Sequence, residues 1–94
     1  MTIYSIKSLD GQECELFTTL DAMAKWLRAK KPVDGKLIFR HPEDEYRDIT
    51  SANLEALFNR CRADGQAPVI IIRRDFFIRT IETEYVYTTI NVNE

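Results

Sequence analysis

Histidine, cysteine and glycine are scarce in this sequence, and their scarcity excludes several kinds of site. The 94 residues include one histidine, two cysteines and three glycines. The glycines are not grouped, so they cannot form a phosphate-binding loop, and no Gly-x-Ser-x-Gly nucleophile signature occurs. Cys14 and Cys61 do not have metal-ligand spacing. These absences predict a protein that is not an enzyme and that holds no cofactor or metal ion.

Long apolar runs and a strong charge of one sign are also missing. No run is long enough to cross a bilayer, and MTIYSIKS has neither the basic nor the apolar region of a secretion signal. The formal net charge is -2, from 13 Lys and Arg against 15 Asp and Glu, which is typical neither of a basic nucleic-acid binder nor of an acidic DNA mimic. We therefore expect a cytoplasmic protein without membrane contact. Two reduced, buried thiols are favoured over a disulfide between the two cysteines.

The composition that remains is that of one small globular domain. Hydrophobic residues make up 45% and charged residues 30% of the chain, so we expect residues 1–94 to form a single domain. A chain of this size buries enough surface for one core between two layers, but not for a deep enclosed cavity as well. Function is therefore expected on a surface or in a shallow groove.

The first third of the chain predicts a β-hairpin followed by a helix. TIYSIKSLDGQECELF is typical of two strands joined at Asp10-Gly11, a dipeptide that favours tight turns, with Cys14 and Leu16 on one face of the second strand. Thr18 and Asp21 then stand at capping-box spacing. Apolar residues recur at helical spacing behind them: Leu20, Met23, Ala24 and Leu27.

The middle of the chain predicts a third strand, KLIFR, a polar loop, HPEDEYRD, and a second helix. Thr50 is a good N-cap for this helix, Ile49 and Leu54 occupy the two ends of a hydrophobic staple, and Gly65 is placed to close the helix. The helix is expected to bury one stripe: Leu54, Leu57, Phe58 and Cys61.

The last third, from residue 69, is β-rich and contains no glycine or proline. Val69 to Ile72 is apolar throughout, which is typical of a central strand. The stretch is too long for one strand, and two bends are conceivable, at 73–75 or at 82–84. The second is favoured because Arg-Arg and Arg-Asp fit tight hairpin turns poorly, and it leaves 69–81 as one bulged strand paired with 85–92.

These elements predict the order ββαβαββ and an α+β fold. Two amphipathic helices on one face of a mainly antiparallel sheet of about five strands bury both apolar stripes with the fewest layers.

The single histidine, His41, is the basis of a catalytic or metal hypothesis. It lies near Glu43, Asp44 and Glu45, and such a group would bind a divalent cation or act as a base. A loop positions ligands poorly, so a solvated acidic loop is favoured.

Nucleic-acid binding is the alternative to protein binding. In a continuous strand, one face carries Arg73, Asp75, Phe77, Arg79 and Ile81, and the other face carries Arg74 and Phe76. We expect Tyr85 and Tyr87 of the next strand to lie across from Phe77 and Arg79. Arginines beside aromatics on an open sheet face are typical of single-strand binding. The competing interpretation pairs the arginines with Glu82, Glu84 or Asp75.

Protein binding is the favoured hypothesis. We expect a small interaction module that acts as an inhibitor, adaptor or regulatory subunit of a larger protein or protein–nucleic acid complex, a role common among small phage, mobile-element and immunity proteins. Trp26 lies at the edge of the first helix's apolar stripe, where it contacts a partner or only covers the core. Self-association through the C-terminal strands would give a homodimer. The expected contact residues are Trp26, Arg73, Arg74, Arg79, Tyr85, Tyr87, Glu43, Asp44 and Glu45.

Overall fold

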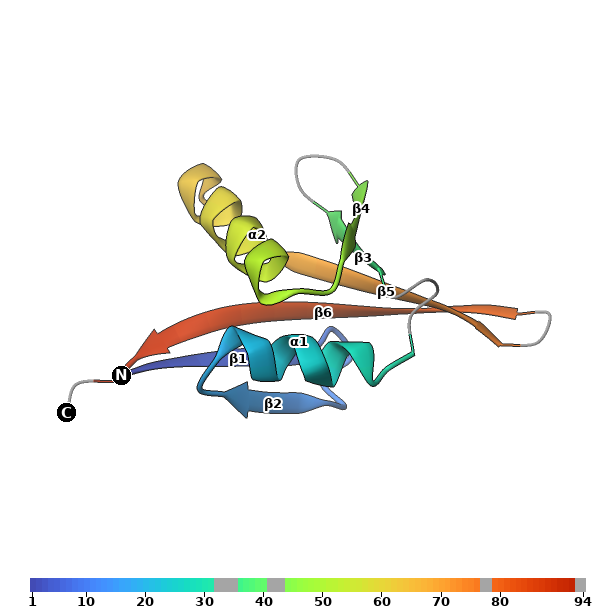
Figure 1. The fold of residues 1–94 in the computed structure, drawn as a ribbon, viewed down its shortest axis with the longest axis horizontal. Coiled ribbons are helices and arrows are strands. Elements are labelled where there is room, and N and C mark those ends of the chain that lie inside the picture. Colours follow the sequence, from blue (N-terminus) through green and yellow to red (C-terminus); the bar gives the residue numbers. More distant parts are fainter. Residues whose placement is uncertain (32–35, 41–43, 77–78, 93–94) are drawn as a thin grey trace.

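Eight elements follow one another in the computed structural model, which describes residues 1–31, 36–40, 44–76 and 79–92. In these ranges six strands form one sheet in the order β2-β1-β6-β5-β3-β4, and every neighbouring pair is antiparallel (Figure 1). The elements are β1 (Thr2–Ser8), β2 (Cys14–Phe17), α1 (Leu20–Arg28), β3 (Lys36–Arg40), β4 (Asp44–Asp48), α2 (Ser51–Asp64), β5 (Val69–Phe76) and β6 (Arg79–Asn91).

The α+β class is confirmed, and the order becomes ββαββαββ because of one added strand. The segment predicted as a polar loop contains β4, which pairs with β3 at the end of the sheet. Charged residues such as Asp44 and Asp48 are typical of edge strands, where they discourage pairing with other chains. The two hairpins β1–β2 and β3–β4 are each followed by a helix, and β6 and β5 lie between them at the centre.

Local chemistry explains where the helices begin and end. Thr19, rather than the expected Thr18, is the N-cap of α1, and its hydroxyl accepts from the Ala22 amide at 3.1 Å. Thr50 caps α2 as predicted, and Gly65 ends α2 in the left-handed region at φ 68, where a residue without a Cβ is favoured.

Both helices pack on the same face of the sheet, which we call the inner face. Their predicted stripes pack against alternating strand residues and are buried except for Leu20 and Phe58, which are half-buried. Tyr85 and Tyr87 are the largest side chains of this core. The remaining strand members of the core are Ile6, Ile70 and Ile72. Val69 to Ile72 is indeed central, because β5 pairs with β6 on one side and with β3 on the other. No helix in the described ranges is long and apolar enough to span a membrane.

The central hairpin extends beyond the rest of the sheet. The molecule measures 49 × 24 × 24 Å, and Figure 1 shows β5 and β6 continuing past the other elements. Both predicted bends were wrong: β5 ends at Phe76 and β6 begins at Arg79, so residues 73–75 and 82–84 lie within strands. The register pairs Arg73 with Glu82 and Arg74 with Ile81. We call residues 73–76 and 79–82 the ribbon arm.

The reversal between Phe76 and Arg79 changes which residues share a face of the arm. Directly paired residues lie on the same face, and Arg79 pairs with Phe76 while Ile81 pairs with Arg74. Arg74, Phe76, Arg79 and Ile81 therefore occupy inner-face positions, whereas the sequence predicted Arg79 and Ile81 on the opposite face from Arg74.

Candidate functional site

Two of the expected contact residues belong to the core. Tyr85 is 1% exposed and Tyr87 is not exposed, because both occupy inner-face positions of β6 beneath the helices. They lie opposite Ile70 and Ile6, not opposite residues of the arm as expected. The Tyr87 hydroxyl donates to the main-chain oxygen of Leu54 at 2.8 Å. Neither ring is available to a partner in this conformation.

Trp26 covers the rim of the core. Its ring makes edge contacts with Phe17 and Tyr85, at centroid distances of 6.0 and 5.4 Å, and the Lys30 ammonium lies 4.3 Å from its centroid. The ring is half-buried. These contacts agree with the interpretation that Trp26 closes the core, and its role in partner binding stays a prediction.

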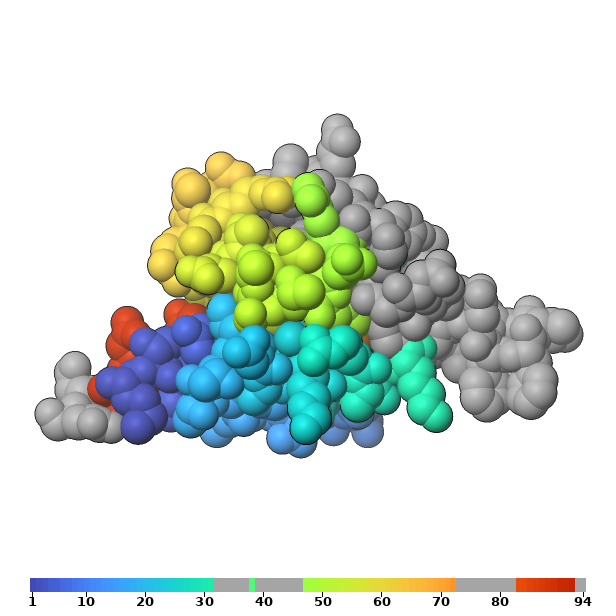
Figure 2. All heavy atoms as spheres, viewed as in Figure 1, coloured from blue at the N-terminus to red at the C-terminus, as the bar shows by residue number. Residues whose placement is uncertain are grey.

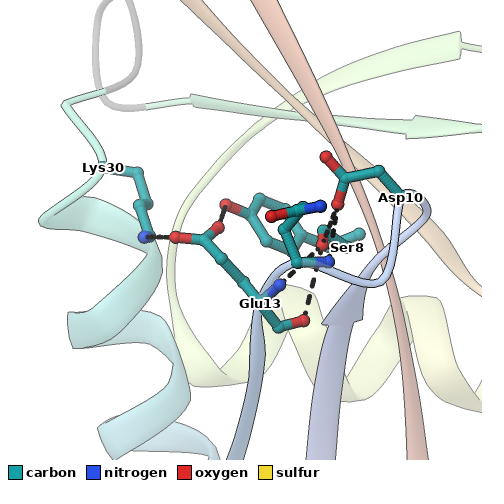
Figure 3. Close-up of polar contacts among 6 residues, drawn as sticks. Ser8, Asp10, Glu13 and Lys30 are labelled. Atoms are coloured by element: carbon teal, nitrogen blue, oxygen red, sulfur yellow. Dashed lines mark hydrogen bonds and ion pairs between the residues drawn. The ribbon is translucent and has the colours of Figure 1, made fainter.

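A polar cluster beside Trp26 joins the first hairpin to the end of α1 (Figure 3). Glu13 accepts from Lys30 at 2.6 Å and from the Tyr85 hydroxyl at 2.5 Å, and these two donors lower the pKa of Glu13. At the turn, Ser8 donates to Asp10 at 2.6 Å, which lowers the pKa of Asp10. The cluster satisfies a buried phenol and stabilises the turn, so its contacts are explained by the fold.

For the other expected contact residues, the positions are those of the strands that contain them. Arg73, Arg74 and Arg79 lie in the ribbon arm, and Asp44 and Glu45 lie in β4. Glu43 and His41 fall outside the described residues. Their roles stay predictions. The register sets Arg73 directly opposite Glu82, but it sets Arg74 opposite Ile81 and Arg79 opposite Phe76.

A groove lies between α2 and the ends of β1 and β6. It has a volume of about 610 Å³, within the range of ligand-binding clefts. Figure 2 shows α2, in yellow, above the first residues of β1, in blue, and the last residues of β6, in red. We call this cleft between the helix and the two strand ends the α2–β6 groove. Its lining residues are Thr2, Tyr4, Leu20, Glu55, Phe58, Asn59, Arg62, Tyr87, Thr89 and Asn91.

One side of α2 supplies the chemistry of the groove. Glu55, Phe58, Asn59 and Arg62 recur at helical spacing, so they share a face, and Glu55 and Arg62 are about 10 Å apart along the axis. The Arg62 guanidinium lies 4.4 Å from the centroid of the Phe58 ring, which packs on Tyr87 at 4.9 Å. The groove thus presents an oriented cation on an aromatic base.

A smaller extension of about 280 Å³ continues the groove towards the loop after α2. It shares Phe58, Arg62, Tyr87 and Thr89 with the main groove and adds three residues of the loop between α2 and β5 and one residue of β6. The added residues are Gln66, Ala67, Pro68 and Thr88.

The sequence predictions missed this site but contained a signal for it. Phe58 was assigned to the buried stripe, while the exposed Arg62 four residues later was not considered. An aromatic residue with arginine at i+4 on a helix favours a stacked pair. The part that β1 and β6 play could not be foreseen without the tertiary fold.

Cys14 is exposed, contrary to expectation, and Cys61 is buried as expected. Burial raises the pKa of the Cys61 thiol. Among the described residues, no group of three or more His, Cys, Asp or Glu is arranged to hold a metal ion.

In comparisons with known proteins, no family model, no curated protein and no solved structure matches this chain.

Proposed function

We propose that this protein is a protein-binding module that uses the α2–β6 groove to occupy a larger macromolecule as an inhibitor, adaptor or regulatory subunit. The observation that carries the proposal is the combination of an open groove with side chains that contribute little to the core. Glu55, Asn59 and Arg62 are exposed on its helical wall.

The residue types in the groove support protein recognition. Arginine and aromatic residues are enriched at interface hot spots, and polar groups around them supply directional hydrogen bonds. Thr2 donates to the Asn91 side chain at 3.0 Å at one end, so part of the polar floor is held in place. The cation of Arg62 and the carboxylate of Glu55 give the groove two ends of opposite charge.

A capture experiment with matched charge reversals tests this function. The tagged protein is used to capture partners from a lysate of its native host, with nuclease-treated and untreated halves, as wild type, Arg62→Glu and Lys25→Glu. Lys25 is an exposed basic residue in the last turn of α1, as Arg62 is in α2, but it does not line the groove. The two substitutions therefore make the same electrostatic change at a helix C-terminus.

The expected result is a stoichiometric protein that survives nuclease, is retained by Lys25→Glu and is lost with Arg62→Glu. Equal capture by all three proteins would contradict the assignment to the groove. Capture that disappears with nuclease would contradict protein binding itself.

Nucleic-acid binding by the ribbon arm is the second candidate function. The register gathers Arg74, Phe76 and Arg79 on one face of a two-stranded ribbon, an element that the major groove of DNA admits. The test is retention on duplex and single-stranded DNA over a salt series. Phosphate contacts predict a steep loss of affinity with salt, and a loss for Arg74→Ala with Arg79→Ala that Arg73→Ala does not reproduce.

A further inference from the structure

The last part of β6 has an open edge next to the α2–β6 groove. The ladder between β5 and β6 starts at Val69 opposite Val86, so within the described residues 87–91 are paired in a ladder with β1 alone. The residue before Val69 is Pro68, which has no amide hydrogen with which to continue the ladder. Beyond it the chain turns back to α2 through Gln66 and Ala67.

The hydrogen-bond pattern identifies the backbone groups on this edge. The Val92 amide donates to the Met1 oxygen at 2.7 Å, and the Glu84 oxygen accepts from Leu9 at 3.2 Å, so both residues bond towards β1. Backbone groups alternate sides along a strand, and the register is continuous between them. Thr89 and Asn91 therefore direct their amide and carbonyl groups away from β1, to the open edge.

From this geometry we infer that the module binds an extended segment of another protein, which adds as a strand to the open edge of β6 and places alternate side chains in the α2–β6 groove. This inference rests on the proposed function and specifies its mode. A residue opposite Thr89 would lie on the inner face, because directly paired residues share a face, and its side chain would enter the extension of about 280 Å³.

The lining of the extension specifies the chemistry of the segment. Phe58, Ala67 and Pro68 provide apolar contacts, and Arg62 is the charged residue among the described residues that line it. The guanidinium lies over the Phe58 ring, and a guanidinium donates paired N–H bonds to a carboxylate. The fitting segment therefore carries an apolar side chain and an Asp or Glu side chain two residues apart, on the same face of the added strand.

A second copy of this chain fits less well. The inner-face residues that its β6 would bring are Tyr87, which is fully buried in its own core, and Thr89 and Asn91, which carry no charge for Arg62. Charge complementarity therefore favours an acidic segment of a different protein.

Two substitutions at one position test strand addition. Thr89→Pro removes an amide that faces the open edge and leaves the bonds to β1, so the chain is expected to fold, since proline is tolerated on such edges. Thr89→Ala keeps the amide and removes only the hydroxyl and methyl. A phage-displayed library of random linear peptides is selected on the wild type, and the enriched peptides are then measured on both variants and on Arg62→Glu.

The inference predicts enriched peptides with the apolar and acidic residues in alternating positions. Their affinity should fall by more than about tenfold with Thr89→Pro and with Arg62→Glu, and by less than about threefold with Thr89→Ala. In the wild type, amide hydrogen exchange at Thr89 and Asn91 should slow when peptide binds. This readout decides the question even when Thr89→Pro does not fold.

The remaining outcomes overturn the inference in distinguishable ways. Affinity lost with Arg62→Glu but kept with Thr89→Pro, with unchanged exchange, would keep the groove as a binding site and reject strand addition. Peptides that bind all variants equally would reject the groove as well. A dimer that Thr89→Pro converts to a monomer would assign the edge to a second copy.

Discussion

Replacing Tyr87 with phenylalanine tests how much the hydrogen bond between β6 and α2 stabilises the fold. The substitution keeps the ring packed on Phe58 and removes the 2.8 Å hydrogen bond to the Leu54 oxygen. A buried hydrogen bond contributes about 1 kcal/mol to the free energy of unfolding, so we expect a loss of about that size near pH 7. For a domain of this size, Tm should fall by roughly 4–8 °C.

The same substitution should reverse its effect at high pH. Burial raises the pKa of Tyr87 above its ordinary value of 10.0. A group whose pKa is higher in the folded state contributes stability that is complete below its unfolded pKa and is lost as pH rises above it. Deprotonation of this tyrosine in the unfolded state should therefore lower the free energy of unfolding of the wild type by about 1.4 kcal/mol per pH unit above roughly pH 10. The variant lacks the phenol and should show no such loss.

The two stability curves should cross where the loss from titration equals the contribution of the hydrogen bond. For a bond worth about 0.5–1.5 kcal/mol, the crossing lies between about pH 10 and pH 11. The assay is urea unfolding of both proteins, monitored by circular dichroism at a series of pH values. Parallel curves at all pH values would refute the protonated, buried phenol, and equal stability at pH 7 would refute the hydrogen bond.

Three further predictions concern features away from the groove. Glu13→Gln should remove part of the acid dependence of stability, because the pKa of Glu13 is lowered in the folded state. The stability that Glu13 contributes is present above its ordinary pKa of 4.5 and is lost as pH falls through the lower folded pKa. The free energies of unfolding of the wild type and the variant should therefore converge in acid, and a constant difference down to strongly acidic pH would contradict the pairing with Lys30 and Tyr85. Gly65→Ala should lower the free energy of unfolding by about 1 kcal/mol, because a side chain is strained at a φ of 68 even though no atom lies within 4 Å of the added Cβ. Unchanged denaturant midpoints would argue against the left-handed cap. A thiol reagent should modify Cys14 in the native protein and Cys61 only on unfolding, as mass spectrometry of the labelled peptides would show, whereas equal labelling rates would contradict the burial of Cys61.

The features that were predictable from sequence are those that depend on neighbours along the chain. Thr50 and Gly65 mark the ends of α2 because a hydroxyl and a missing Cβ act on the backbone beside them. The stripes of both helices followed from helical periodicity, and the first hairpin from Asp10-Gly11. The local structures that these residues favour all agree with the two-layer fold.

The errors concern features that depend on distant partners. β4 has few apolar residues, and its extended conformation depends on pairing with β3 rather than on its own composition. The position of the reversal after Phe76 follows from the register between β5 and β6, which pairs Phe76 with Arg79. In the register between β6 and β1, Ser8 lies opposite Tyr85. The same register sends Tyr85 and Tyr87 into the core, although their sequence context suggested a surface.

The groove as a whole lay beyond sequence reasoning for the same reason, although the spacing of Phe58 and Arg62 was a signal for one wall of it. Arg62 and Thr89 are far apart along the chain and line the same groove because α2 lies beside the end of β6. The open edge arises from the length of β5, which begins opposite Val86 and leaves the last residues of β6 without a second neighbour in the described chain. Only a three-dimensional arrangement brings the edge and the cation together.

The most direct test of protein binding through the α2–β6 groove is an NMR titration of the isotope-labelled protein with the partner obtained by capture. The account predicts chemical-shift changes that concentrate on the groove, at the backbone amides of Phe58, Arg62, Thr89 and Asn91. Changes that concentrate on the ribbon arm, residues 73–76 and 79–82, with the groove unaffected, would contradict it.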